Sequence, residues 1–226
     1  MKISIGIMTS YKLKERYNAC KDVWCKDFEN VYFFGGDIYD PNLIRLDNVG
    51  EDYDSAFLKQ QLGLKKMYEY DPNMDWYCFL GCDNILFKNR IDKLNDFDTN
   101  KDYIIGQCYN RFETINGINI NLIAGGGGIF ISNSLMKKIY PFIDEFNEHW
   151  RNLNLITETT SNNISYPHGD VAIVYMVKKF FGVDSTHLDG LHSQNPDKYK
   201  DDDNYLPLTF HYICPEEMKK IYEKYK

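Results

Sequence analysis

The stretch Asp75-Trp-Tyr-Cys-Phe-Leu-Gly-Cys-Asp-Asn84 decides the fold. Its first half is an apolar, aromatic-rich run with the composition of a buried strand, and that run ends at Gly81. In open α/β sheets, ligands bind in the crevice beyond the carboxyl ends of the strands. Asp83 is therefore predicted to meet a metal ion or a nucleotide. A second interpretation is that Gly81 to Asn84 form only a turn, because Gly, Asp and Asn all favour turns.

The segments before this stretch alternate between strand and helix patterns. Lys2 to Thr9 and Val31 to Phe34 are apolar, β-branched or aromatic runs typical of strands, and Leu13 to Phe28 has apolar residues at helical spacing. Ser55 to Tyr70 predicts a helix with Asp54 or Ser55 as its N-cap. The polar segment between Asp40 and Asp54 predicts a loop. This order indicates an α/β fold that opens with a nucleotide-binding unit.

The segments after this stretch are shorter and include a glycine run. Strands are predicted at Tyr103 to Cys108 and Ile118 to Ile123, with a hairpin signal at Asn116-Gly117. Ala124 is followed by four consecutive glycines, Gly125 to Gly128. Because such a run costs backbone entropy, another group is expected to approach it closely. The alternative is a flexible hinge.

The last third of the chain predicts further helices and strands. A helix is expected from Ser134 to about Phe146, and a polar surface or lid loop from Asn152 to Tyr166. Asp170 stands at the start of an apolar helix, where it can serve as a cap. The remaining segments predict strands at Gly182 to His187 and Leu208 to Tyr212 and a helix that begins at Pro215.

Composition limits the classes of function. The chain has 226 residues, which suits one domain over 1–226, and its net charge of -7 argues against nucleic acid as a partner. Six cysteines lack a zinc-binding pattern, so mostly buried thiols are expected. No apolar run reaches the length of a signal peptide or a membrane anchor, which predicts a cytoplasmic chain without an anchor.

In their order along the chain, these motifs resemble the Fringe and core-1 β1,3-galactosyltransferase family. The similarity covers nearly the whole chain. It is carried by Ile5-Gly-Ile-Met-Thr-Ser10 with Arg16 and Trp24, Trp76-Tyr-Cys78 with Asp83-Asn84, Ala124 to Ser132, Gly169-Asp170, and Gly190-Leu-His-Ser193 with Thr209-Phe-His-Tyr212.

The resemblance implies a GT-A fold, with a nucleotide-binding half over about 1–85 and an acceptor-binding and catalytic half over about 86–226. It implies inverting sugar transfer from a nucleotide-diphosphate donor, most simply a UDP-sugar, to a glycan, glycoprotein or lipid-linked acceptor. Asp170 would be the catalytic base, and Asp83 and His192 would bind Mn²⁺ or Mg²⁺. The donor would contact Thr9, Ser10, Arg16, Lys65, Asp83, Gly125, Gly126 and Gly127. The strand pattern around His211 predicts a structural residue, whereas the resemblance keeps His211 near the site.

The sequence departs from the family pattern at acidic positions. The acidic triplet of the family is Gly81-Cys82-Asp83 here, the first acid of the later pair is Gly169, and the acid after the second strand is Gly36. Two alternatives to the inverting enzyme follow. One is a nucleotide-sugar or glycan-binding protein that has lost catalysis, and the other is a retaining transferase of the same fold.

Overall fold

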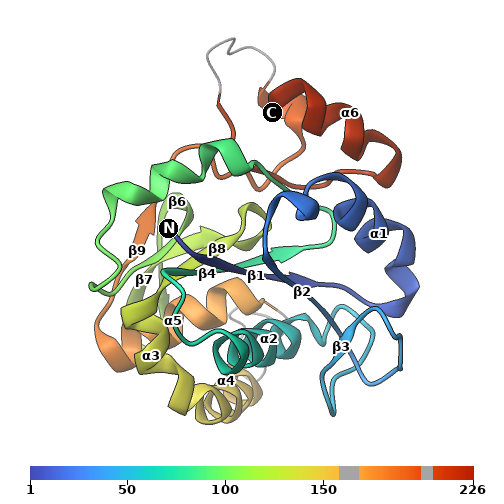
Figure 1. Cartoon of the computed structure of the whole chain (residues 1–226). Helices are drawn as coiled ribbons and strands as arrows, with labels where there is room; N and C mark the ends of the chain where they lie inside the picture. The colour runs from blue at the N-terminus through green and yellow to red at the C-terminus, as the bar shows by residue number, and fades with distance from the viewer. Residues whose placement is uncertain (158–167, 200–205) are drawn as a thin grey trace.

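A mixed β-sheet forms the centre of the computed structural model, which describes residues 1–157, 168–199 and 206–226 (Figure 1). The strands of this sheet are β1 (Ile3–Met8), β2 (Asn30–Gly35), β3 (Ile44–Arg45), β4 (Trp76–Gly81), β6 (Ile104–Ile115), β7 (Ile118–Ala124), β8 (Ile129–Ser132) and β9 (Ser185–His187). Their order is β3-β2-β1-β4-β8-β6-β7, with β9 paired to β6. A second, two-stranded sheet pairs β5 (Ile85–Leu86) with β10 (Thr209–Phe210).

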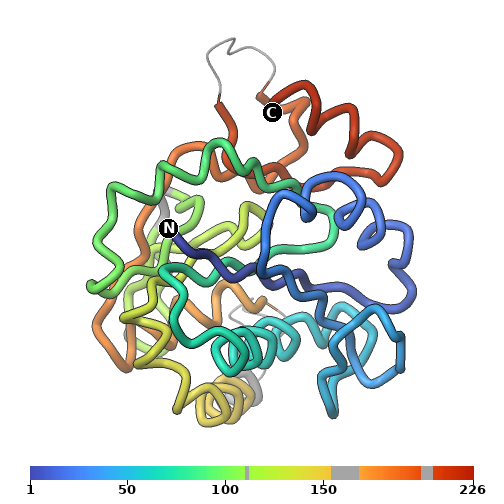
Figure 2. Tube along the Cα trace, viewed as in Figure 1, coloured from blue at the N-terminus to red at the C-terminus, as the bar shows by residue number. Residues whose placement is uncertain are grey.

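Strand β4, which the opening stretch predicts, lies in the middle of the large sheet. It pairs in parallel with β1, from Ile3 opposite Trp76 to Met8 opposite Gly81, and antiparallel with β8. In Figure 2 the N-terminal trace of β1 runs beside β4 although the two are far apart in the sequence. Every residue of β4 before Gly81 is buried, because helices cover both faces of the sheet.

The helices form two layers. One face of the sheet packs against α2 (Ala56–Tyr70), α3 (Asn133–Ile139), α4 (Ile143–Thr157) and α5 (Gly169–Phe181). The other packs against α1 (Lys14–Val23), α6 (Pro215–Tyr225) and the 3-10 segment η3 (Lys88–Asp96). Short 3-10 turns complete the described chain: η1 (Tyr11–Leu13), η2 (Cys25–Asp27), η4 (Gly125–Gly127), η5 (Tyr140–Phe142) and η6 (Pro196–Tyr199).

The prediction of one helix from Ser134 to Phe146 is wrong. The chain forms α3 and α4 with η5 between them, because Pro141 has no N–H and cannot continue the hydrogen bonds of α3. Helix α4 then extends to Thr157, so the first residues of the expected loop from Asn152 are helical. The rest of that predicted loop lies outside the described residues.

Smaller differences also have local causes. The helix predicted over 13–28 ends at Val23, with Cys25 in η2, and the expected loop over 40–54 contains the short strand β3. Neither predicted N-cap side chain caps α2; the Asp52 carboxylate instead accepts hydrogen bonds from the Ser55 N–H (2.9 Å) and hydroxyl (2.8 Å).

Several sequence predictions are confirmed. Asn116 and Gly117 both have positive φ, as a tight hairpin turn between β6 and β7 requires. Five of the six cysteines are buried, and Cys214 is exposed. Among the described residues, no helix combines the length and the apolar character needed to cross a membrane.

Candidate active site

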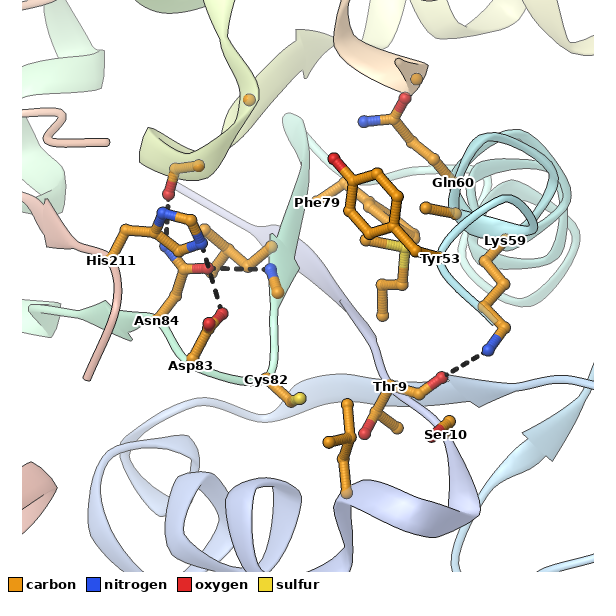
Figure 3. Close-up of a pocket in the computed structure, with 18 of the residues that line it drawn as sticks. Thr9, Ser10, Tyr53, Lys59, Gln60, Phe79, Cys82, Asp83, Asn84 and His211 are labelled. Carbon is orange, nitrogen blue, oxygen red and sulfur yellow. Dashed lines mark hydrogen bonds and ion pairs between the residues drawn. The ribbon is translucent and has the colours of Figure 1, made fainter. Parts of the chain in front are cut away.

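A pocket of about 430 Å³ opens at the carboxyl ends of β1 and β4, where ligands bind in open α/β sheets. Distant parts of the chain supply its walls (Figure 3). These are the turn after β1, the start of α2 with the loop before it, the end of β4 with the turn after it, the glycine run of η4, the start of α5, and the residues after β10, which makes six segments in all.

The turn after β4 is held by Asn84. Its Oδ1 accepts a hydrogen bond from the Gly81 N–H (2.9 Å), and its Nδ2 donates to the carbonyl oxygens of Gly126 (2.6 Å) and Phe210 (3.1 Å). Asn84 is completely buried, so these bonds join three walls of the pocket away from water. The segment is therefore a turn that also presents Asp83 to the pocket.

Asp83 has two basic side chains as neighbours. Its Oδ1 lies 3.4 Å from His211 Nε2, and its Oδ2 lies 3.3 Å from Arg16 Nη1. Burial raises the pKa of the Asp83 carboxyl, but the hydrogen bond and charge of His211, with the charge of Arg16, outweigh burial. The pKa of Asp83 therefore lies below its ordinary value, and the group is ionised at neutral pH.

The orientation of His211 is fixed by its second ring nitrogen. His211 Nδ1 lies 3.1 Å from the carbonyl oxygen of Ser193, which can only accept a hydrogen bond, so Nδ1 carries the proton. The Nε2 lone pair then faces Asp83, where either a proton or a cation must separate it from the carboxylate. Such an outer hydrogen bond is typical of histidines that bind metals.

The glycine run lies against polar side chains of the pocket. A Cβ atom on Gly125 would lie 2.8 Å from Asp170 Oδ2, and one on Gly126 would lie closer still to His211 Nδ1. Any larger residue would displace these groups. The close approach expected from the sequence is therefore confirmed at these two positions.

Asp170 does not act as the N-cap of α5, because His168 occupies that position. Its Oδ2 accepts a hydrogen bond from the Gly125 N–H (2.8 Å), and its Oδ1 accepts one from the Val171 N–H (2.9 Å). The carboxylate is thus fixed between the start of α5 and the glycine run. Each oxygen keeps a second lone pair for a ligand.

A buried ion pair that no sequence motif predicts closes another side of the pocket. Lys59 Nζ donates to the Thr9 carbonyl oxygen (2.9 Å) and lies 3.3 Å from Glu51 Oε2, and both side chains are almost fully buried. Glu51 Oε1 accepts a hydrogen bond from the Gly36 N–H (2.7 Å). A carboxylate therefore stands beside Gly36 although residue 36 is not an acid. Lys59 lies away from the apolar stripe that Phe57, Leu64 and Tyr68 form in the period of α2, so the sequence gives no signal for its burial.

The pocket includes most but not all of the predicted site residues. Thr9, Ser10, Arg16, Asp83, Gly125, Gly126 and Asp170 line it, whereas Lys65, Gly127 and His192 do not. Lys65 forms an ion pair with Asp144 of α4 (2.5 Å). His192 is buried against Tyr199 and Phe210, and burial, with the charge of Lys93, lowers its pKa to about 4.

The sheet, its two helical layers and the pocket at the strand ends define a GT-A fold of the kind found in glycosyltransferases. Solved glycosyltransferases share this fold at low identity. One takes part in glycosylation of the major capsid of PBCV-1 (TM-score 0.50, 13% identity, 98% of this chain and 99% of that chain). A second is the galactosyltransferase LgtC, solved with donor and acceptor sugar analogues (TM-score 0.59, 14% identity, 99% of this chain and 96% of that chain). A third is GlyE of Streptococcus pneumoniae TIGR4 (TM-score 0.55, 14% identity, 99% of this chain and 60% of that chain).

The family is shown by the sequence itself. The model of the Fringe-like family matches residues 1–218, and the chain therefore belongs to that family and is a glycosyltransferase. No curated protein matches the chain significantly.

Proposed function

We propose that this protein transfers a sugar from a nucleotide-diphosphate donor, most simply a UDP-sugar, to a hydroxyl group of a glycan acceptor, with inversion at the sugar carbon. The observation that carries the proposal is the fixed Asp170 carboxylate in the same pocket as the pair of Asp83 and His211. In this proposal Asp170 removes the proton of the acceptor hydroxyl, and Asp83 and His211 act on the diphosphate.

Asp170 is the proposed base. As the acceptor oxygen forms its bond to the sugar, the bond from the sugar to the diphosphate breaks, and the hydroxyl proton passes to Asp170. A carboxylate can do this at neutral pH when it lies within hydrogen-bond reach of the hydroxyl. The two backbone N–H groups that hold Asp170 fix its direction. A protein that only bound nucleotide sugars would not need this arrangement.

The proposed ligands of a divalent cation are Asp83 and His211, which replaces His192 in this role. Two ligand atoms that each lie about 2.1 Å from one ion at a right angle are about 3.0 Å apart. The separation of 3.4 Å between Asp83 Oδ1 and His211 Nε2 is close to that value. Mixed carboxylate and imidazole ligands suit Mn²⁺.

This pair would need further ligands. Among the described residues, no group of three or more His, Cys, Asp or Glu side chains could hold a metal. Diphosphate oxygens and water would complete the coordination. A bound cation would supply Lewis-acid stabilisation of the leaving diphosphate. Arg16, beside Asp83, would add positive charge for the same group.

The test is incubation with a panel of UDP- and GDP-sugars, with and without Mn²⁺, followed by measurement of nucleotide release and thermal stability. We expect release from at least one UDP-sugar and a higher Tm with that donor and Mn²⁺. Binding without release, with acceptors present, would favour the binding-protein alternative. If the protein binds none of the UDP- and GDP-sugars, the proposal is refuted. The anomeric configuration of the product, read by NMR, separates inversion from retention.

A further inference from the structure

Four glycines of the pocket each lie against the polar end of another side chain. A Cβ atom on the glycine would lie within 3 Å of that polar end in the pairs Gly81 with Asp83, Gly125 with Asp170, Gly126 with His211, and Gly169 with Gln60. The proposed function uses Asp83, Asp170 and His211. Gln60 is the fourth such group, and it has no role so far.

Gln60 is a buried amide that reaches the pocket. It lies on α2 with only 8% of its surface exposed, and it lines the cavity. Within the described part of the chain, its Oε1 is buried without a hydrogen-bond partner. A buried amide oxygen without a partner is costly, and a ligand contact at the other end of the amide, Nε2, would offset the cost of this orientation.

The position of Oε1 orients the rest of the amide. A Cβ atom on Gly169, the first residue of α5, would lie 2.6 Å from Gln60 Oε1, so this oxygen packs against the N-terminus of that helix. The positive end of a helix dipole favours an oxygen there. The Nε2 group then turns toward the open pocket, as Figure 3 shows, and offers N–H donors to a ligand.

The charges on this side of the pocket point to a neutral ligand group. Asp52 and Asp170 also line this part of the cavity, and Glu51 is already neutralised by Lys59. Both carboxylates accept hydrogen bonds, but neither forms an ion pair with another described residue, so their negative charge disfavours a phosphate, whereas a hydroxyl can donate a hydrogen bond to them. A sugar hydroxyl can accept from the amide and donate to a carboxylate at once.

We propose that Gln60 is a specificity-determining residue that binds a hydroxyl group of the donor sugar and orients the sugar beside Asp170. The inference rests on the proposed function, because it requires a nucleotide sugar in the pocket. Gly169 is part of the same device, since any side chain there would displace the amide.

The test compares wild type with Gln60→Met, which keeps the length and removes the amide. The probes are UDP and the UDP-sugar that the panel selects, each with Mn²⁺, measured by calorimetry. We expect affinity for UDP to stay within about twofold and affinity for the UDP-sugar to fall about tenfold, the value of one hydrogen bond to a sugar hydroxyl. An equal loss for both probes, or no loss for either, would overturn the inference.

Gln61→Met is the matched control. Gln61 is the neighbouring buried amide on α2, and it does not line the pocket. We expect its substitution to leave both affinities unchanged; a loss equal to that of Gln60→Met would show a general effect on α2 and contradict the role of Gln60. If wild type itself binds neither probe, the proposed function fails, and the inference fails with it.

Gly169→Ala provides a second variant that leaves Gln60 in place. Its methyl group would push the far end of the Gln60 side chain out of position. We expect the same selective loss of UDP-sugar affinity, and no further loss in the double variant Gln60→Met, Gly169→Ala, because both changes remove one interaction. Additive losses would contradict the coupling.

Discussion

At the scale of single residues, the pocket is built from side chains whose direction is fixed by a second contact. Asp170 is held by two backbone N–H groups, and His211 by the Ser193 carbonyl oxygen. Asp83 is held ionised by His211 and Arg16. Each of these groups can therefore act in one geometry, which is the condition for catalysis by positioning.

Substitution of Asp170 by asparagine tests the base. We expect Asp170→Asn to reduce sugar transfer by about 100-fold or more, because the amide cannot take the acceptor proton, while donor affinity changes little. Transfer is measured with saturating donor and donor affinity by calorimetry. Asp144→Asn is the control, since Asp144 is a first-turn acid of α4 outside the pocket. An active Asp170→Asn enzyme would remove Asp170 from this role.

The two histidine candidates can be separated by metal titration. We expect His211→Asn to weaken Mn²⁺ affinity by at least about tenfold, in line with losses seen when a metal centre is altered, and His192→Asn to leave it near the wild-type value. Mn²⁺ binding in the presence of UDP is followed by electron paramagnetic resonance. The reverse result would restore His192 as the ligand.

At the scale of elements, the glycine run matters because of what packs on it. Gly126 lies against His211, whereas Gly117 in the hairpin turn has positive φ, and a Cβ atom added there would have nothing within 4 Å. The same chemical change should therefore have different effects at the two sites. Close approach governs the first site, and backbone conformation governs the second.

Gly126→Ala and Gly117→Ala form a matched pair for this argument. We expect Gly126→Ala to lower Mn²⁺-dependent activity at least about tenfold, because the methyl group displaces His211. Gly117→Ala should cost about 1 kcal/mol of the free energy of unfolding and leave activity intact, because alanine is strained at positive φ. Urea unfolding and nucleotide release give the two readouts. Equal activity losses would contradict a specific role for the glycine run.

At the scale of the whole molecule, buried polar groups join segments that are distant in sequence. The pair of Lys59 and Glu51 connects α2 with the end of β1 at Thr9 and the end of β2 at Gly36. Removing only one partner leaves a buried charge, which costs more than removing both. The pair is therefore a stability element as well as a wall of the pocket.

A double-mutant cycle measures this pair. We expect Lys59→Met to cost about 3 kcal/mol or more of the free energy of unfolding, because Glu51 stays buried without its cation. The double variant Lys59→Met, Glu51→Gln should recover part of that loss. Urea unfolding of the four proteins gives the coupling energy. A double variant that loses the sum of both single losses would contradict a coupled pair.

Acid stability should depend on His192, because burial and the charge of Lys93 lower its pKa to about 4 in the fold. Asp189 and His187 are smaller influences on this pKa. The unfolded chain binds this proton near pH 6.5, so acidification below that pH favours unfolding. Between pH 7.5 and 5 we expect a loss of about 2 kcal/mol from this group. In His192→Asn the pH-dependent loss should be smaller by that amount, as measured by urea unfolding at both pH values; an unchanged pH dependence would contradict it.

The sequence by itself determined the local features of this protein. The apolar period of β1 and β4, the acid after Gly81, the glycine run and the acid at the start of α5 all follow from neighbouring residues, and they identify the α/β fold and most of the pocket. These features depend on short-range patterns, which sequence shows directly.

The tertiary structure decided which distant side chains meet. It brings His211 to Asp83 rather than His192, places Lys59 at the pocket rather than Lys65, and sets Gln60 against Gly169. These choices depend on helix phase and on the pairing of β10 with β5, which carries His211 toward the turn after β4. Such contacts are fixed only when long-range packing closes the core, so no local pattern could distinguish the two histidines or the two lysines.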